Sequence, residues 1–367
     1  MKTVEIEQIG KKFFATIDGT RFIVGQSTEF TNSSGNVTRG LKSTGLETLA
    51  YDREEHRPQF GLWADLMDPT VKVEGGHLDA LNTYDKAFFT FGFLQFAAHI
   101  AEGDFVKYFR KLLALPIARE YFPDLRLNDQ NHIGRVSGSG IEELENKQSS
   151  RKLMTYLNPS SQEVDKTEVV NAAKFIHWVR TDPEHRRIQV ETGAEVCKGI
   201  LGGRAEQLKL NGRPDTHCLV IMDILHQGRG GPSIPKIKTA LSSTDPFGQL
   251  LEIGKAGFQL RVEGLAARIG FLVNEGRLGR STYEGATKDF VGSGILQHDS
   301  DDEVTGTIVK IGEPSEHQFW LYACGQRRPL VSMEEVNELR SAGLLDTKVT
   351  GLSREVLNAI PIMGGRS

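Results

Sequence analysis

Glu74 is the residue of this chain whose type and setting best suit acid catalysis. It lies in the segment 68–99 (DPTVKVEGGHLDALNTYDKAFFTFGFLQFAAH), where Gly75 and Gly76 follow it directly. Glycine at this position is typical of a helix C-terminus, although the stretch VKV is also compatible with a short strand. The negative end of a helix dipole and burial beside a Phe-rich run both disfavour a carboxylate. Such a group stays protonated near neutral pH and can act as a general acid.

Asp85 provides a second carboxyl group eleven residues further on, in a different setting. It belongs to a polar, turn-like stretch (NTYD, residues 82–85), where a solvated carboxylate stays ionised. There it can activate water or stabilise positive charge on a sugar ring. A protonated and an ionised carboxyl group are the usual equipment of a glycoside hydrolase, because the leaving oxygen of a glycosidic bond is poor until it is protonated.

Five phenylalanines crowd residues 88–96 (FFTFGFLQF), in a chain whose aromatic content is only 8%. We interpret this run mainly as core, with one or two rings that also contact a sugar. Gly92 permits close approach of the backbone to a ligand or to another element. Gln95 offers donors and acceptors to sugar hydroxyl or N-acetyl groups.

Elements at the start of the chain have clear local signals. The first 30 residues read as strands, and Asp18 with Gly19 forms a strong hairpin-turn signal. Residues 31–45 (TNSSGNVTRGLKSTG) are polar and Gly-rich, which indicates a loop.

The later elements are mainly helical. Apolar residues recur at helical spacing from Asp104 onwards, which predicts a helix. Residues 134–150 are rich in Gly, Ser and charge, which indicates an exposed connection between two lobes. Two short β-rich runs within residues 304–324 predict a late hairpin.

Composition narrows the classes of function. The chain has 367 residues, enough for about two domains. Its 44 Lys and Arg against 48 Asp and Glu give a net charge of −4, which argues against nucleic-acid binding as the main function. No apolar run is long enough to span a membrane. His77 and His99 flank the Glu74 segment without metal-ligand spacing, and the three cysteines are too scattered for zinc or a disulfide framework. We therefore expect no metal and no cofactor.

The pattern Glu-Gly-Gly, then Tyr-Asp, then Phe-Gly-Phe-Leu-Gln resembles the active-site segment of the lysozyme-like superfamily. That family includes goose-type lysozymes, lytic transglycosylases, phage muramidases and chitosanases. In it a catalytic Glu closes a helix, a loop or small sheet carries a second polar or acidic residue, and a Gly-x-x-Gln stretch starts the next helix. The resemblance implies Glu74 as the acid and Asp85 or Thr90 as its partner. It also implies Gln95 as a sugar-facing residue, and we expect Thr90 and Tyr84 to contact the substrate as well.

A looser resemblance and two departures accompany this match. Residues 173–199 resemble the helix pair of chitosanase-like members, with Trp178 and Gln189 at matching places. The Gly-Leu-Met-Gln form common in transglycosylases is here Gly-Phe-Leu-Gln, and Gly75 stands where a Ser often follows the catalytic Glu. These departures count against a lytic transglycosylase of the standard type without excluding one.

These observations predict a mainly helical, two-lobed lysozyme-like fold with a small N-terminal β-hairpin and a short late β element. The expected domains are a hairpin region (1–45), a catalytic domain (46–280) and a C-terminal β/α extension (281–367). The expected function is hydrolysis of a β-1,4-linked amino-sugar polymer, with peptidoglycan as the substrate. A chitosanase-like hydrolase is one alternative. Another is a non-catalytic glycan-binding or phage-structural protein.

The N-terminus bears on where such an enzyme acts. It lacks the continuous apolar stretch of a secretory signal peptide. We therefore expect synthesis in the cytoplasm, followed by action at the cell wall after lysis or dedicated export. The sequence identifies no delivery or immunity partner.

Overall fold

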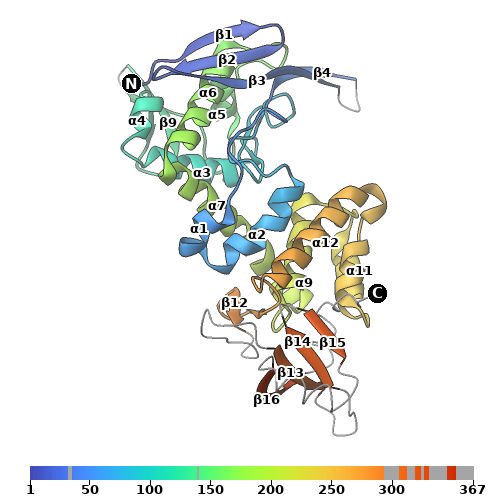
Figure 1. Ribbon diagram of the computed structural model, residues 1–367. Coiled ribbons are helices and arrows are strands. Elements are labelled where there is room, and N and C mark those ends of the chain that lie inside the picture. Colours follow the sequence, from blue (N-terminus) through green and yellow to red (C-terminus); the bar gives the residue numbers. More distant parts are fainter. Residues whose placement is uncertain are drawn as a thin grey trace. The chain divides into compact units, whose positions relative to one another are not determined.

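The computed structural model describes residues 1–31, 35–138 and 140–292 together with the backbone of four later strands (Figure 1). The chain divides into two compact units. The first unit comprises Met1–His56 and Glu74–Val196, and the second unit comprises Arg57–Val73 and Cys197–Ser367.

A seven-stranded sheet dominates the first unit. Each strand pairs antiparallel with the next one along the chain, so the spatial order equals the sequence order. The strands are β1 (Glu5–Ile9), β2 (Lys12–Ile17), β3 (Thr20–Thr31), β4 (Val37–Lys42), β5 (Leu81–Asn82), β6 (Thr90–Phe91) and β7 (Phe96–Ala97).

Turn chemistry explains the start of this sheet. Asp18 and Gly19 both have positive φ, 51° and 77°, as a two-residue turn between twisted antiparallel strands requires. The predicted hairpin turn is therefore confirmed. The loop predicted for residues 31–45 is wrong in its second half, because β4 occupies Val37–Lys42 and pairs with β3. The sequence of β4, VTRGLK, shows no regular alternation of apolar and polar residues, so its pattern does not indicate a strand.

Helices and a smaller sheet complete the first unit. The helix predicted from Asp104 is confirmed, and its apolar face is buried. Residues 134–150 contain most of an antiparallel β9–β10 hairpin. The remaining elements are α1 (Arg53–Phe60), which ends in the second unit, α3 (Asp104–Leu113), α4 (Ala118–Tyr121), β8 (Leu125–Leu127), β9 (Ile133–Ser137), β10 (Gly140–Glu143), α5 (Arg151–Leu157), α6 (Lys166–Thr181) and α7 (Pro183–Gly202), which also ends there.

The core of the first unit is aromatic. α6 packs against β2 and β3 (Figure 1), and its Phe175 is fully buried. Five rings have their centroids 5.0–5.8 Å from that of Phe175, namely those of Phe89, Phe91, Phe105, Phe109 and Phe122.

The second unit is built around α9 (Asp215–Gln227), in which every residue from Cys218 to Ile224 is buried. Near it, α2 (Leu62–Val73) packs against α12 (Gln259–Asn274). The other elements are α8 (Ala205–Leu208), α10 (Ser233–Leu241), α11 (Pro246–Glu252), a 3-10 turn η1 (Lys255–Gly257), β11 (Ser281–Glu284), β12 (Asp289–Gly292), β13 (Gly306–Ile311), β14 (Phe319–Ala323), β15 (Gln326–Pro329) and β16 (Leu345–Leu352).

The late β element is confirmed, since β13 and β14 pair antiparallel. The helical part expected for the 281–367 extension lies outside the described residues. Among the helices that the structure describes, none combines the length and apolar character needed to cross a bilayer.

The expected fold class is wrong. The protein is an α+β protein with 45% helix and 20% strand, and its largest sheet has seven strands, so it is not the mainly helical lysozyme-like fold. Besides β4, the sequence pattern missed three further strands of that sheet, because β5, β6 and β7 have only two residues each. A two-residue strand shows no periodicity.

Asp79 anchors the segment between α2 and β5 to the rest of the first unit. Its carboxylate is buried and accepts hydrogen bonds from the backbone N–H groups of Thr48 (3.1 Å) and Leu49 (3.2 Å). It also forms an ion pair with Arg180 of α6, at 2.6 Å. One side chain therefore joins three separate parts of the chain.

We expect Asp79→Asn to lower the free energy of unfolding by about 3 kcal/mol, because it leaves the Arg180 guanidinium partly buried without its counter-ion. Urea unfolding followed by circular dichroism measures the change. The matched control is Glu142→Gln, which removes the exposed Lys152–Glu142 pair and should change stability little. Equal effects of the two substitutions would contradict the anchoring role of Asp79.

Candidate functional site

Glu74 is the first residue after α2, as expected of a glutamate that closes a helix. It is half-buried. Gly75 and Gly76 follow with φ of 99° and 70°, so the chain turns sharply in a conformation that side chains disfavour. The Gly76 carbonyl then accepts the N–H of Tyr51 at 2.7 Å, which fixes the path of the chain just beyond the glutamate.

Gln189 of α7 joins this segment to the hairpin of β6 and β7. Its side chain is fully buried, and its Nε2 donates to the carbonyl of Leu78 at 3.1 Å. Its Oε1 accepts the N–H of Phe93 at 3.4 Å. A Cβ on Gly92 would lie 2.8–2.9 Å from the Gln189 amide group, so only glycine fits there. The loop after Glu74 and the hairpin turn are therefore held against one side chain.

The polar groups around Gln189 are buried and have no contact with solvent. Its Nε2 also donates to the Tyr108 hydroxyl at 3.3 Å, and that hydroxyl contacts Nε2 of His185. His185 is fully buried, and this burial lowers its pKa well below the usual value. The imidazole is thus neutral, and this cluster positions the hairpin rather than carrying charge.

Gln95 ends the turn of this hairpin. The turn spans Gly92–Gln95 between β6 and β7, so the expectation that this stretch starts the next helix is wrong. Gln95 has a positive φ of 55°, and its Nε2 donates to the Gly92 carbonyl at 3.0 Å. Its side chain is only part-buried. The turn therefore displays a polar side chain at the end of the hairpin that Gln189 clamps.

Asp85 and Tyr84 lie beyond the other end of these short strands. Asp85 accepts the Nδ2–H of Asn82 (3.0 Å) and the N–H of Ala87 (2.8 Å), so both of its oxygens shape the β5–β6 connection. The Tyr84 carbonyl accepts the Thr38 hydroxyl, and burial raises the pKa of the Tyr84 phenol. Both residues are part-buried.

Register separates the five candidate residues into two groups. The N–H of Gly92 bonds the Ala80 carbonyl at 2.9 Å, whereas Thr90 pairs with Asn82 at the opposite end of the strand pair. The segment that follows Glu74 therefore meets the hairpin at its Gln95 end. Asp85 and Tyr84 follow the Asn82 end, and Thr90 is a buried strand residue at that same end.

The Phe-rich run forms core, in agreement with its interpretation from the sequence. Phe89, Phe91, Phe93 and Phe96 are each at most 2% exposed. Phe93 stacks on Tyr51 with ring centroids 5.1 Å apart. The rings hold the small strands in place, because strands of two residues have few hydrogen bonds of their own.

Glu168 is a buried carboxyl group that the sequence reasoning missed. It lies in α6 and accepts hydrogen bonds from the N–H of Leu41 (3.0 Å), the N–H of Asp165 (3.2 Å) and the Thr83 hydroxyl. Burial raises its pKa to about 7, although those hydrogen bonds act in the opposite direction. The capping-box spacing of Asp165 and Glu168 could have revealed it.

The described residues contain no group of three or more His, Cys, Asp or Glu arranged to hold a metal ion. Comparisons with protein-family models, with curated proteins and with solved structures find no match to this chain.

Gly92→Ala tests the packing on Gln189. We expect a loss of about 3 kcal/mol of unfolding free energy, since the new Cβ meets Gln189 and the backbone has a φ of 88°. The control is Gly10→Ala, which has a similar φ of 60° but open space, and should lose about 1 kcal/mol. Adding Gln189→Ala to Gly92→Ala should relieve the clash. Strictly additive effects in this double-mutant cycle would count against it.

Glu168 should make stability depend on pH. The pKa of this carboxyl group is 4.5 in the unfolded chain, and it is raised to about 7 in the folded protein. Below pH 4.5 the group is therefore protonated in both the folded and the unfolded state. The contribution of Glu168 to the free energy of unfolding is therefore fully present below pH 4.5. It falls by about 3 kcal/mol as the pH rises through 7. Glu168→Gln should flatten this loss in urea unfolding between pH 4.5 and 8. Parallel curves for the two proteins would contradict it, because every other carboxyl is common to both.

Proposed function

We propose that the protein cleaves β-1,4-linked amino-sugar polymers, with peptidoglycan as the substrate and Glu74 as the general acid. The observation that carries this proposal is the clamp made by Gln189. It holds the loop after Glu74 against the turn that displays Gln95. An acid catalyst must be held in a fixed position relative to the groups that seat its substrate. The proposal rests on this local arrangement and not on a lysozyme-like fold.

In this mechanism Glu74 donates its proton to the leaving glycosidic oxygen, and Gln95 hydrogen-bonds a sugar hydroxyl or N-acetyl group. Asp85 is engaged by Asn82 and Ala87, so it maintains the β5–β6 connection. The N-acetyl group of the substrate then serves in place of a second carboxylate, as in substrate-assisted glycosidases. This favours an N-acetylated polymer over chitosan.

The test is digestion of purified peptidoglycan, chitin oligosaccharides and chitosan, with products identified by mass spectrometry. We expect the wild type to release muropeptides and Glu74→Gln to lose activity by about 100-fold or more. The matched control is Glu163→Gln, which changes an exposed carboxylate and should leave activity intact. Reducing ends indicate hydrolysis, and anhydro ends indicate transglycosylation.

Asp85→Asn distinguishes the two roles of that residue. A positioning role predicts a loss well below 100-fold together with lower thermal stability, whereas a second catalytic carboxylate predicts a loss comparable to that of Glu74→Gln. Wild-type cleavage that survives Glu74→Gln would overturn the assignment of the acid. Binding to peptidoglycan without any product would indicate a non-catalytic glycan-binding protein, and cleavage of chitosan alone would indicate a chitosanase.

A further inference from the structure

A pocket of about 570 Å³ lies in the first unit, beside α5. Phe88 and His99 line it from the two open ends of the β6–β7 hairpin, and Arg151 and Met154 line it from α5. The pocket is thus at the opposite end of that hairpin from the Gly92–Gln95 turn. It is separate from the site proposed for Glu74.

Two buried polar groups in the pocket lack partners among the described residues. Ser150 is 2% exposed and its hydroxyl makes no hydrogen bond. The Nδ1 atom of His99 is also buried and unpaired. A buried polar group without a partner destabilises a protein by about 1–3 kcal/mol, so native structures rarely keep one unless water or a ligand satisfies it. Ser150 and His99 both line this pocket, so a molecule bound there lies beside both residues.

Charge in the pocket has one sign. Arg151 is the one charged side chain among the lining residues, and none of them is acidic. Arg151 is exposed and forms no ion pair with a described residue. Beside it, Phe88, Met154 and Pro159 provide apolar surface. Arg151 and the buried Ser150 line the same pocket, and this pair of side chains suits a carboxylate or phosphate, while the apolar wall suits a hydrocarbon body.

The walls of the pocket are held in place from both sides. The Nδ2 group of Asn158, at the end of α5, donates to the carbonyls of Phe88 (3.0 Å) and Thr83 (3.2 Å). The Oδ1 atom of Asn146 accepts the N–H groups of Gln148 (2.9 Å) and Ser149 (3.1 Å). These contacts fix the loop that leads into Ser150 and Arg151.

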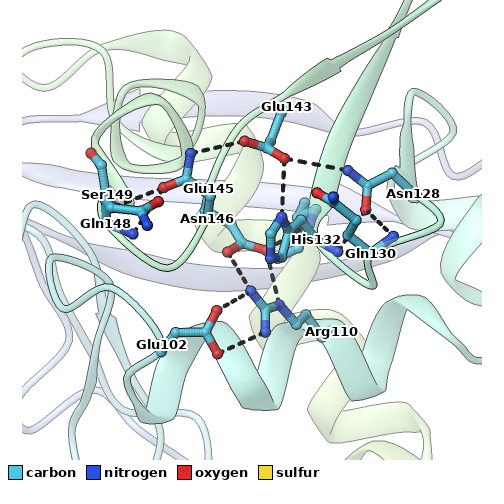
Figure 2. A network of polar contacts seen from close by, with 11 residues as sticks. Glu102, Arg110, Asn128, Gln130, His132, Glu143, Glu145, Asn146, Gln148 and Ser149 are labelled. Atoms are coloured by element: carbon cyan, nitrogen blue, oxygen red, sulfur yellow. Dashed lines mark hydrogen bonds and ion pairs between the residues drawn. The ribbon is translucent and has the colours of Figure 1, made fainter.

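A polar network extends this support (Figure 2). Asn146 donates to Glu143 at 2.8 Å, and Glu143 pairs with His132 at 3.0 Å. Arg110 joins the buried Glu145 to Glu102, with 2.6 Å to each carboxylate. Glu102 follows Ala101, which lines the pocket. A pocket built in this way needs little ordering when it binds a ligand.

We infer that this pocket binds a small organic anion. The anionic group pairs with Arg151 and accepts a hydrogen bond from Ser150, while an apolar body packs on Phe88 and Met154. His99 supplies a further hydrogen-bond partner to the ligand. The inference does not depend on the function proposed for Glu74.

The test is titration calorimetry on the full chain with N-acetyl-L-phenylalanine, its uncharged amide and phenyl phosphate as probes. We expect the acid to bind with a millimolar or lower Kd and at least about fivefold more tightly than the amide. The phosphate arm shows whether the site prefers phosphate to carboxylate. Glu74→Gln should bind all three probes like the wild type.

Substitutions locate the binding. Arg151→Gln should bring acid and amide to within about twofold of each other, because it removes the charge that separates them. The matched control is Lys152→Gln. Lys152 is the next residue, lies outside the lining of the pocket and pairs with Glu142 at 2.9 Å, so this substitution should leave the affinities for acid and amide unchanged.

Ser150→Ala adds a readout without ligand. This substitution should weaken the binding of N-acetyl-L-phenylalanine. It should leave the melting temperature of the free protein unchanged or higher, since it removes an unpaired buried hydroxyl. Three results would each overturn the inference. They are no saturable binding of the acid or the phosphate up to about 10 mM, equal affinity for acid and amide, and unchanged discrimination in Arg151→Gln.

Discussion

The arrangement of the first unit depends on the contact between Gly92 and the side chain of Gln189. A glycine with positive φ lies against a buried amide group that binds Leu78 on one side and Phe93 on the other. Strands of two residues have too few hydrogen bonds to hold their own position. The amide group and the aromatic core around Phe175 supply what those strands lack, so the loop after Glu74 and the hairpin turn have one relative position.

This constraint places the two sites that we propose at opposite ends of the small strands β5, β6 and β7. At one end the segment after Glu74 meets the turn that carries Gln95, the arrangement on which the proposed glycosidic cleavage rests. At the other end lie Asp85 and the pocket that Arg151 and Ser150 line. A single rigid element therefore positions two sites with different chemistry. In our proposals, one site offers a carboxyl group to a sugar polymer, and the other offers a cation to a small anion.

The sequence predicted local features of the segment around Glu74 better than the contacts that its residues make. The sequence pointed to segment 68–99, and the structure makes that segment the link between helix and sheet. The sequence did not reveal that Asp85 and Glu74 lie at opposite ends of the short strands. Distance along the chain does not show at which end of a strand a loop emerges. Gln95 was expected at the start of a helix, but it lies in a hairpin turn. A glycine shortly before a polar residue occurs in both settings, so the sequence did not distinguish them.

The sequence by itself determined the features that local backbone chemistry sets. These include the Asp18–Gly19 turn, which needs two residues tolerant of positive φ, the helix that starts at Asp104 and the burial of the Phe run. Only the tertiary structure decided the fold class and the residues that meet. Gln189 contacts Phe93 across 96 positions, and Ser150 shares a pocket with His99. Periodicity shows which face of an element is buried, but the partner that covers that face depends on packing between distant segments, which no local pattern encodes.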